Sequence, residues 1–446
     1  METNKSLPIA IIGAGPVGLA AAAHLKVRNL PFLLFEAGAT VASNILSWRH
    51  IRVFSPWRYN IDKAARQLLS NTAWQSPDDE ALPTGEELYN EYFKPLAELP
   101  SLKSNIIFGA KVLSIGRKNV DKMKTWGRES LPFVVQAFRE NEIEQYYVKG
   151  VIDASGTWSS PNPIGSGGVY ALGEVENHDR IFYGIPDILN QHEIRYRNKS
   201  VLVVGSGHSA INAILELDKL KEKYPGTEIH WAVRKNNISD VYGGQENDAL
   251  AARGALGIKI EELIINDRVS VYTSFHIQQL INQENKLTIV GFQGDQRLAL
   301  PGIDEIISNT GSRPDFSFLS EVRLNIDTSL ESVAELADLI DPNIHSCGTV
   351  RPHGEKELRQ PDKNFYIVGS KSYGRAPTFL MATGYEQVRS IVAALAGDME
   401  AARNVELDLP ETGVCSVNLN STAACCGNEV KPKIQVMKKA NAGACC

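Results

Sequence analysis

The chain has 446 residues, of which 43% are hydrophobic and 22% are charged, and these proportions indicate an ordinary globular protein of two or three domains. Its formal net charge of −6 argues against nucleic acid or an anionic membrane surface as the main partner, and no apolar run reaches the roughly 18–20 residues that span a membrane. Five of the six cysteines lie beyond residue 414. The rest of the chain is therefore almost free of cysteine and is not built on disulfides. This is typical of proteins from a reducing compartment, so we expect a cytoplasmic protein.

Residues 8–36 carry the pattern of a dinucleotide-binding βαβ unit. A short apolar run predicts a buried strand, the sequence GAGPVG follows it, and an Ala-rich helix leads to a second apolar run that ends in an acid. The first glycine permits a tight turn, the second lets the backbone approach a pyrophosphate, and the third lets the helix pack closely on the strand. The acid can accept hydrogen bonds from a ribose, and an ordinary glycine-rich turn would lack this ordered set. The residues assigned to this site are Gly13, Gly15, Pro16, Gly18 and Glu36.

Aromatic side chains are concentrated in residues 37–62, directly after this unit. We assign Trp48 to a wall beside a flat ring of the ligand, and the alternative is that these aromatic rings form the core of a small subdomain. Helical patterns follow at residues 63–70 and 84–99, and a capping box at Thr84 opens the second of them.

Three later strands end in small residues. Residues 149–157 form an apolar strand that ends in ASGT, and residues 303–314 repeat this ending as NTGSRP. A further apolar strand at residues 364–368 leads into a glycine and then a final helix at residues 377–395. Small residues at a strand end let a bulky ligand approach the backbone. The glycines assigned to ligand binding in these segments are Gly156, Gly311 and Gly369.

The opening pattern recurs at residues 201–235, again as strand, glycine motif, helix and strand. The motif is GSGHSA, with Ala210 in place of the last glycine, and the second strand ends in two cations rather than in an acid. Cations at this position suit a 2′-phosphate, so the unit predicts NADPH rather than NADH; the alternative is a merely solvated strand end. The residues assigned to this site are Gly205, Gly207, His208, Ser209, Arg234 and Lys235.

This ordered set of motifs resembles the flavoproteins with two dinucleotide-binding domains, over about residues 7–396. The resemblance implies FAD across the first domain, with its pyrophosphate on the first glycine motif and its ribose on Glu36, and NADPH on the second motif. The fold class is then α/β, with two Rossmann-like domains, the first interrupted by the second, and a flexible cysteine-containing tail. The predicted segments are residues 1–160 and 306–397 for the FAD-binding domain, 161–305 for the NADPH-binding domain and 398–446 for the tail.

The motifs favour one branch of these flavoproteins. Disulfide reductases of this kind carry a Cys-x4-Cys or Cys-x2-Cys pair beside the flavin, and this chain has no cysteine before Cys347. Residues 310–315 resemble the ATGYxPD stretch of the class B flavin-dependent monooxygenases, and residues 83–92 resemble their helix before the third strand. Their F-x-G-x3-H-x3-Y/W fingerprint is present only in degraded form, with Gly173 followed by His178. The core is also similar to flavoproteins associated with arsenic resistance in bacteria.

The resemblance implies a monooxygenase in which a flavin peroxide, formed with dioxygen, oxygenates a soft small-molecule substrate, with arsenic or another metalloid as the target of detoxification. His208 is one candidate catalytic residue, because a helix N-terminus lowers the pKa of an imidazole, and contact with NADPH alone is its alternative role. Arg313 is the second candidate, and a surface ion pair is its alternative.

The tail from residue 398 is polar and poor in large apolar side chains, so we expect it to be disordered. Its adjacent cysteines suit a soft ion such as arsenite or mercuric ion. Two alternatives to a monooxygenase stay open: an NADPH-dependent flavin reductase of a thiophilic metal that the tail delivers, and a metalloid-sequestering protein with a vestigial flavin domain. The predicted metal ligands are Cys425, Cys426, Cys445 and Cys446.

Overall fold

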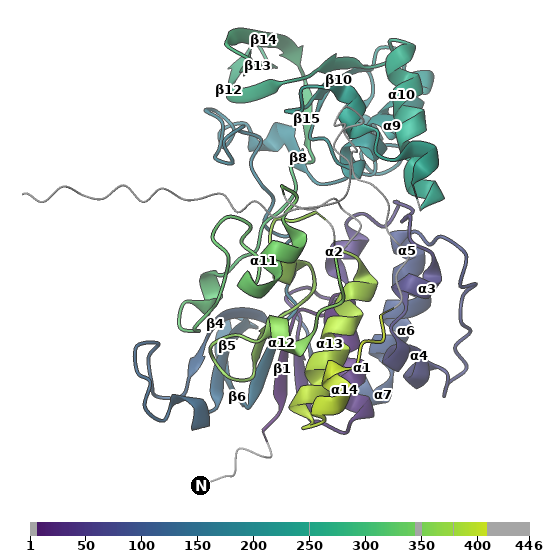
Figure 1. Ribbon diagram of the computed structural model, residues 1–446. Helices are drawn as coiled ribbons and strands as arrows, with labels where there is room; N and C mark the ends of the chain where they lie inside the picture. The colour runs from purple at the N-terminus through teal and green to yellow at the C-terminus, as the bar shows by residue number, and fades with distance from the viewer. Residues whose placement is uncertain (1–6, 249, 344–349, 378, 408–446) are drawn as a thin grey trace, which may run out of the picture.

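The computed structural model describes residues 7–248, 250–343, 350–377 and 379–407, and it has two bodies. Figure 1 shows the first and last parts of the chain, purple and yellow-green, together in the lower body, and the middle part, teal, in the upper body. The chain thus leaves the first body and later returns to it. None of the helices in these described ranges combines the length and the apolar character needed to cross a membrane.

The first body is built on a parallel five-stranded sheet. The strand order is β16-β7-β1-β2-β3, and every pair of neighbours runs parallel. Except for the half-buried edge strand β3, the strands are short apolar runs that are buried along most of their length, as expected for a parallel sheet covered on both faces. Their bounds are β1 (Ile9–Ile12), β2 (Phe32–Phe35), β3 (Ile106–Ile107), β7 (Gly150–Asp153) and β16 (Phe365–Ile367).

Two long helices cover this sheet. Helix α1 (Pro16–Val27) packs against α13 (Met381–Leu395), and alanines on several sides of α1 are fully buried between its neighbours. Shorter elements complete the body: α2 (Ser43–Leu46), α3 (Trp57–Asn60), α4 (Lys63–Leu69), α5 (Gly85–Glu87), the π-helix η1 (Leu88–Phe93), α6 (Lys94–Glu98), α7 (Pro100–Lys103), α11 (Ala334–Ile340), α12 (Glu355–Leu358), α14 (Met399–Arg403) and the 3-10 turns η2 (Arg128–Ser130), η6 (Ser317–Leu319) and η7 (Gly369–Tyr373).

A three-stranded antiparallel sheet lies beside the first body, in the order β4-β5-β6. Its strands are β4 (Lys111–Arg117), β5 (Phe133–Arg139) and β6 (Glu142–Val148). Alternate residues of β5 are buried, with Phe133, Val135 and Ala137 at 0% exposure, so one face of this sheet joins the core.

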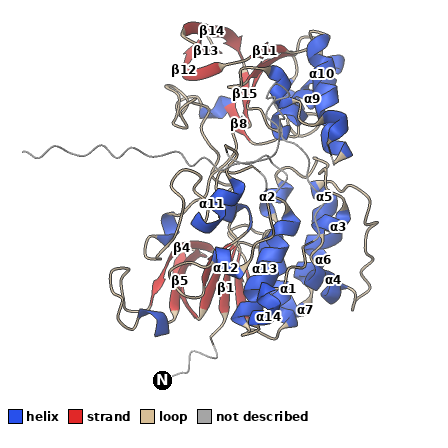
Figure 2. Ribbon diagram, in the orientation of Figure 1, coloured by secondary structure: helices blue, strands red, loops and turns tan. Residues whose placement is uncertain are grey.

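The second body repeats the parallel design in the order β11-β10-β9-β15-β8. Residues of β9 alternate between two apolar clusters, one beneath helices α9 and α10 and one beneath an antiparallel sheet, β12-β13-β14 (Figure 2). The elements are η3 (His178–Arg180), β8 (Ile181–Tyr183), α8 (Glu193–Tyr196), β9 (Ser200–Val204), α9 (His208–Lys223), β10 (Glu228–Ala232), η4 (Ile238–Val241), η5 (Gln245–Asn247), α10 (Ala251–Ile265), β11 (Ser270–Tyr272), β12 (Phe275–Gln283), β13 (Lys286–Gln293), β14 (Gln296–Ile303) and β15 (Glu305–Ser308).

The structure differs from the predicted boundaries where the chain returns to the first body. Strand β15 pairs with β8 and β9 in the second sheet, so the chain returns to the first body after Ser308 rather than at residue 306. Tertiary pairing rather than local pattern decides this boundary.

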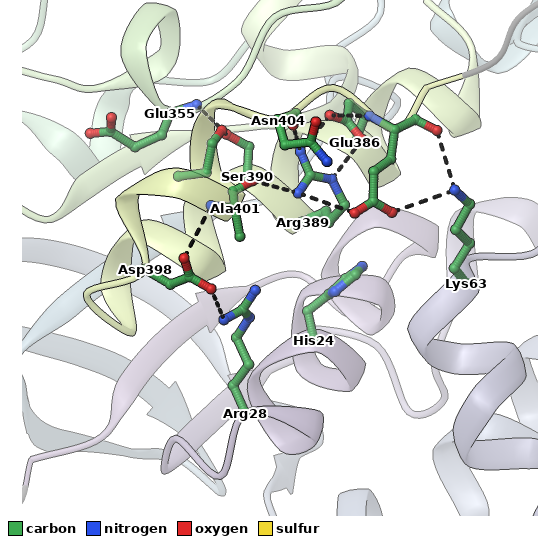
Figure 3. Close-up of polar contacts among 12 residues, drawn as sticks. His24, Arg28, Lys63, Glu355, Glu386, Arg389, Ser390, Asp398, Ala401 and Asn404 are labelled. Carbon is green, nitrogen blue, oxygen red and sulfur yellow. Dashed lines mark hydrogen bonds and ion pairs between the residues drawn. The ribbon is translucent and has the colours of Figure 1, made fainter.

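The predicted tail begins too early, because residues 398–407 extend the first body. Asp398 caps α14 by accepting a hydrogen bond from the Ala401 N–H at 3.0 Å, and its carboxylate also pairs with Arg28 at 3.0 Å (Figure 3). The Ser390 hydroxyl of α13 donates to the Ala402 carbonyl at 2.6 Å. The N-cap, the ion pair and this hydrogen bond hold α14, a short polar helix that composition alone does not predict.

The two bodies meet at a buried pair of ionisable groups. Atom Nε2 of His50, in the first body, lies 3.9 Å from Oε2 of Glu216 on α9, and neither atom has a hydrogen-bond partner. Burial lowers the pKa of His50, and burial raises the pKa of Glu216 to about 7. The His50 imidazole is therefore neutral at neutral pH, so this contact is not an ion pair, and the Glu216 carboxyl ionises only as the pH rises through about 7.

Glu216→Gln should make the protein more stable at pH 8 while changing little at pH 5. A carboxyl whose pKa is higher in the folded than in the unfolded state stabilises the fold below about pH 4.5, and that contribution is lost as the pH rises through about 7. A glutamine does not ionise, so its contribution to stability does not fall with pH. At pH 8 the unfolding free energy of Glu216→Gln should therefore exceed that of the wild type by on the order of 1–3 kcal/mol.

Denaturant unfolding from pH 5 to pH 8 measures this difference, with Glu222→Gln on the exposed side of α9 as the matched control. Parallel stability profiles for the wild type and Glu216→Gln would contradict the assignment.

Candidate functional site

The first glycine motif forms a tight loop between β1 and α1. Gly13 has φ +95°, and a Cβ there would lie 2.9 Å from the Ala154 carbonyl oxygen. A Cβ on Gly18 would lie 1.9 Å from the Gly13 carbonyl oxygen, so the helix can approach the loop only without a side chain there. Gly15 instead borders open space, and its neighbour Pro16 begins the helix. The first two positions have the turn and the close packing that the sequence predicts, and Gly15 has the room that the predicted approach of a ligand requires.

Glu36 lies at the predicted place, beside this loop at the end of β2. Its two carboxylate oxygens accept hydrogen bonds from the backbone N–H groups of Ala14 and Gly38, each at 2.8 Å. The Ser43 hydroxyl donates to it at 3.3 Å. The carboxylate is therefore fixed next to the glycine loop, where a ribose would have to lie for the loop to hold the pyrophosphate.

A fully buried ion pair lies at the end of β7. The Lys371 ammonium of η7 is 2.7 Å from the Asp153 carboxylate, and both side chains have 0% exposure. Lys371 also donates to the Ser155 hydroxyl at 3.0 Å and to the Asp315 carbonyl at 2.7 Å. This contact joins the three small-residue segments that the sequence assigns to ligand binding.

The remaining residues assigned to the first site surround this pair and the glycine loop. The N–H of Gly369 donates to the Gln387 side chain at 2.7 Å, and the residue lies against Val17 of α1. Gly156 faces Ser370. Trp48, in the loop after β2, packs on Gly85, and its ring lies 6.4 Å from that of Trp158; its place in a wall beside the ligand stays a prediction.

The second glycine motif repeats the first between β9 and α9. Gly205 has φ +130°, and a Cβ there would lie 2.3 Å from the Asn309 carbonyl oxygen. Gly207 borders open space at the start of α9, and Ala210 is fully buried. Ser209 follows in the first turn and is half-buried. No side chain in the described ranges caps α1 or α9, so both helix N-termini can offer N–H groups to an anion.

A cavity of about 970 Å³ opens from this second loop toward the first body. Its walls include the loop itself, the loop after β10, the ends of β7 and β15, and the segment between η7 and α13. The residues that matter here are Phe54, Thr157, Gly205, Gly207, His208, Arg234, Lys235, Arg253, Gly311, Ser370, Phe379 and Leu380. The cavity therefore joins the second motif to the segments around the buried lysine.

His208 lies in this cavity at the first position of α9. Its ring is 5.5 Å from that of Phe54, which comes from the first body. Its pKa is lowered, as the sequence predicts, although burial rather than the helix terminus is the first cause and the positive charge of Arg253 the second. The imidazole is therefore neutral at neutral pH, which suits contact with a nucleotide.

The two predicted cations lie at the edge of the same cavity. Nη1 of Arg234 donates to the Ser166 carbonyl oxygen at 3.2 Å, and Nζ of Lys235 donates to the Asp240 carbonyl oxygen at 2.6 Å. Both side chains keep further N–H donors, so they can meet a phosphate at the end of β10.

Arg313 is not part of this cavity lining. Its guanidinium makes a forked contact with the Glu331 carboxylate, at 2.5 and 3.2 Å, which is the surface ion pair given as its alternative. The catalytic role of Arg313 stays a prediction, and Arg313 does not line the cavity. The predicted metal ligands Cys425, Cys426, Cys445 and Cys446 lie outside the described residues, as do Cys347 and Cys415.

Sequence reasoning missed Arg253 and Glu174, which shape the site, and it noted Phe54 only as one of the aromatic residues at 37–62. Phe54 and Arg253 line the cavity, and the Arg253 guanidinium forms a fork with Asp248 at 2.7 and 2.8 Å. Glu174 is fully buried behind the cavity wall. The nearby sequence of Arg253 offered a signal, because its partner Asp248 lies in the same short stretch, whereas the contacts of Phe54 and Glu174 are made by the fold.

Both sites fit nucleotide cofactors. The first combines an open glycine position, an uncapped helix start and a fixed carboxylate, which suit the pyrophosphate and ribose of FAD. The second combines the same loop with two cations in place of the carboxylate, which suits NADPH.

Comparisons with known proteins agree with this fold. The family model described as pyridine nucleotide-disulphide oxidoreductase matches residues 10–338. No curated protein sequence matches the chain. Bacillithiol disulfide reductase Bdr (YpdA) from Bacillus cereus is similar in structure, with a TM-score of 0.65 at 18% identity over 88% of this chain and 99% of that one.

Two further structures are similar and carry different activities in their names. Thioredoxin reductase from T. acidophilum has a TM-score of 0.55 at 14% identity, over 88% of this chain and 99% of that one. Ornithine hydroxylase (PvdA) from Pseudomonas aeruginosa has a TM-score of 0.57 at 13% identity, again over 88% and 99%. At these identities the likeness shows the fold and does not separate reductase from hydroxylase. The chain belongs to the pyridine nucleotide-disulphide oxidoreductase family, whose members use FAD and NAD(P)H.

Proposed function

We propose that this protein is an NADPH-using, FAD-dependent monooxygenase of a soft small-molecule substrate. The observation that carries the proposal is the position of the thiols. All six cysteines lie at residue 347 or later, so neither glycine motif nor any described part of the cavity wall supplies a dithiol. A flavin held here has no protein disulfide beside it in the described residues, which favours dioxygen as its electron acceptor.

The residues of the chain bind and orient both cofactors. The first glycine loop and Glu36 hold FAD, and the second loop, with Arg234 and Lys235, holds NADPH. FAD, when bound, supplies hydride acceptance from the nicotinamide and reaction with dioxygen. His208 and Phe54, from different bodies, close on each other across the cavity, and a neutral imidazole there touches the nucleotide without adding charge.

The substrate class is proposed from the sequence alone. Two adjacent-cysteine pairs near the C-terminus suit a soft ion, so a trivalent arsenical is the substrate we would test first. The reductase hypothesis keeps one specific observation in its favour, since the same cysteines could serve as the thiols that the cavity wall lacks. Sequestration by a vestigial flavin domain is disfavoured by the intact glycine loops.

Oxygen dependence separates the monooxygenase from the reductase. With the purified full chain, NADPH oxidation monitored at 340 nm should fall at least about tenfold under anaerobic conditions after the first turnover, because dioxygen would be the acceptor. The oxygenated product of a trivalent arsenical should form only in air. Equal steady-state rates with and without dioxygen would contradict the monooxygenase.

The C-terminal cysteines give a second test. A variant that ends at residue 407 keeps α14 and its contacts, so it should retain bound flavin and NADPH oxidation. We expect it to lose arsenite binding, measured by equilibrium dialysis. Replacement of the four paired cysteines by serine in the full chain is the matched control. Undiminished arsenite binding in both variants would remove the role given to the tail.

Two glycine substitutions test the first site. Gly18→Ala should destabilise the protein by about 1–3 kcal/mol, because its Cβ would overlap the Gly13 carbonyl oxygen. Gly15→Ala should change stability by less than about 1 kcal/mol but lose flavin, because its Cβ has room in the protein and fills the space of the pyrophosphate.

Thermal unfolding and the flavin-to-protein absorbance ratio measure these two effects. Gly207→Ala is the matched control, because it changes the corresponding position of the second loop and should keep the flavin. Full flavin occupancy in Gly15→Ala would argue against the first loop as the FAD site.

A further inference from the structure

Glu174 lies behind the cavity wall and is fully buried. One carboxylate oxygen accepts hydrogen bonds from the Ile164 N–H at 2.9 Å and the Tyr183 hydroxyl at 2.6 Å. The other accepts from the Ala171 N–H at 2.8 Å. A single acceptor-only group therefore ties the two ends of residues 164–171 to each other and to β8.

The segment that Glu174 holds at its two ends is also bound at its middle, where the Ser166 N–H donates to the Ile277 carbonyl oxygen at 3.0 Å, and it is part of the cavity and contacts Arg234. Ile164, Gly165, Ser166 and Gly168 line the cavity. The Ser166 carbonyl oxygen accepts the hydrogen bond from Nη1 of Arg234 at 3.2 Å. Arg234 itself is exposed, so this carbonyl is the contact that restrains its long side chain among the interactions of the described residues.

Restraint of an exposed arginine affects ligand selectivity. A guanidinium fixed in advance loses less conformational entropy when it binds a phosphate, and one hydrogen bond to a carbonyl leaves its other N–H groups available. The benefit applies only to a ligand that carries the phosphate. A nucleotide with a free 2′-hydroxyl gains nothing from it.

We propose that Glu174 is a positioning residue for recognition of the 2′-phosphate: by fixing residues 164–171 it places the Ser166 carbonyl where it orients Arg234. The proposal rests on the proposed use of NADPH at the second glycine loop. Glu174 touches no cofactor and acts through the segment that it anchors.

The test compares two nucleotides that differ by the 2′-phosphate. Isothermal titration of the flavin-loaded full chain with 2′,5′-ADP and with 5′-AMP gives both affinities without turnover. Glu174→Gln replaces one carboxylate oxygen by an NH2 group, which then faces the N–H of Ile164 or Ala171 or the hydroxyl of Tyr183 and cannot accept their hydrogen bonds. The affinity for 2′,5′-ADP should therefore fall about tenfold and the affinity for 5′-AMP less than about twofold. Glu176→Gln, an exposed neighbour with the same charge change, should alter neither affinity.

A double-mutant cycle sharpens the result. In the Arg234→Ala background, Glu174→Gln should cause no further loss of 2′,5′-ADP affinity, because the side chain that it positions is gone. An equal loss of both nucleotides in Glu174→Gln, or a further loss of 2′,5′-ADP in the double variant equal to that in the single one, would overturn the proposal.

A second variant covers failure of Glu174→Gln to fold. Tyr183→Phe keeps the carboxylate and removes one of its three donors, so it should give a smaller loss that is again confined to 2′,5′-ADP. An unselective loss would overturn the role of Glu174. If the wild type binds both nucleotides equally, the NADPH assignment itself fails and this proposal falls with it, whereas a wild-type preference combined with an unselective Glu174→Gln effect overturns the positioning role alone.

Discussion

The architecture depends on the buried ion pair between Lys371 and Asp153. A charge removed from water must be matched, and loss of one partner of such a pair costs about 3–5 kcal/mol in other proteins. Here the ammonium also meets the Ser155 hydroxyl and the Asp315 carbonyl, and it lies 4.4 Å from the centre of the Phe318 ring. One side chain thus holds together the end of β7, the segment after β15 and the turn η7. The chain crosses between the bodies after β7 and after β15, and the proposed flavin site is built on these two segments and on η7.

The two glycine loops have the same backbone geometry but suit different ligands. In each loop one glycine permits a positive φ or close contact, and another borders open space at the start of an uncapped helix. The difference lies in the side chains at the end of the following strand, a carboxylate held by backbone N–H groups in the first unit and two cations in the second. The cavity of about 970 Å³ then connects the second loop to the first body, so electrons would pass across the boundary between the bodies.

Local patterns predicted the parts of the fold that local forces determine. Both βαβ units, the capping box at Thr84 and Glu36 follow from periodicity, glycine positions and side-chain chemistry over short stretches. The missed features depend on distant partners. Strand β15 joins the second sheet by pairing with β8 and β9, and α14 is held by α13 and Arg28. The buried partners of Glu174 are likewise brought together by the fold, and its sequence neighbours give no sign of them.

The return of the chain to the first body has a consequence for the order of folding. Strand β16 pairs with β7, Lys371 meets Ser155 at a sequence separation of 216, and the chain between them contains the whole second sheet. During synthesis the edge of β7 therefore emerges long before its partner strand and before the ammonium that neutralises Asp153. Contacts so distant in sequence make folding slow, because the intervening loop must close first. The second body can fold as a unit in that interval and bring the two halves of the first sheet together, so its early folding would limit exposure of an unpaired strand edge to other chains.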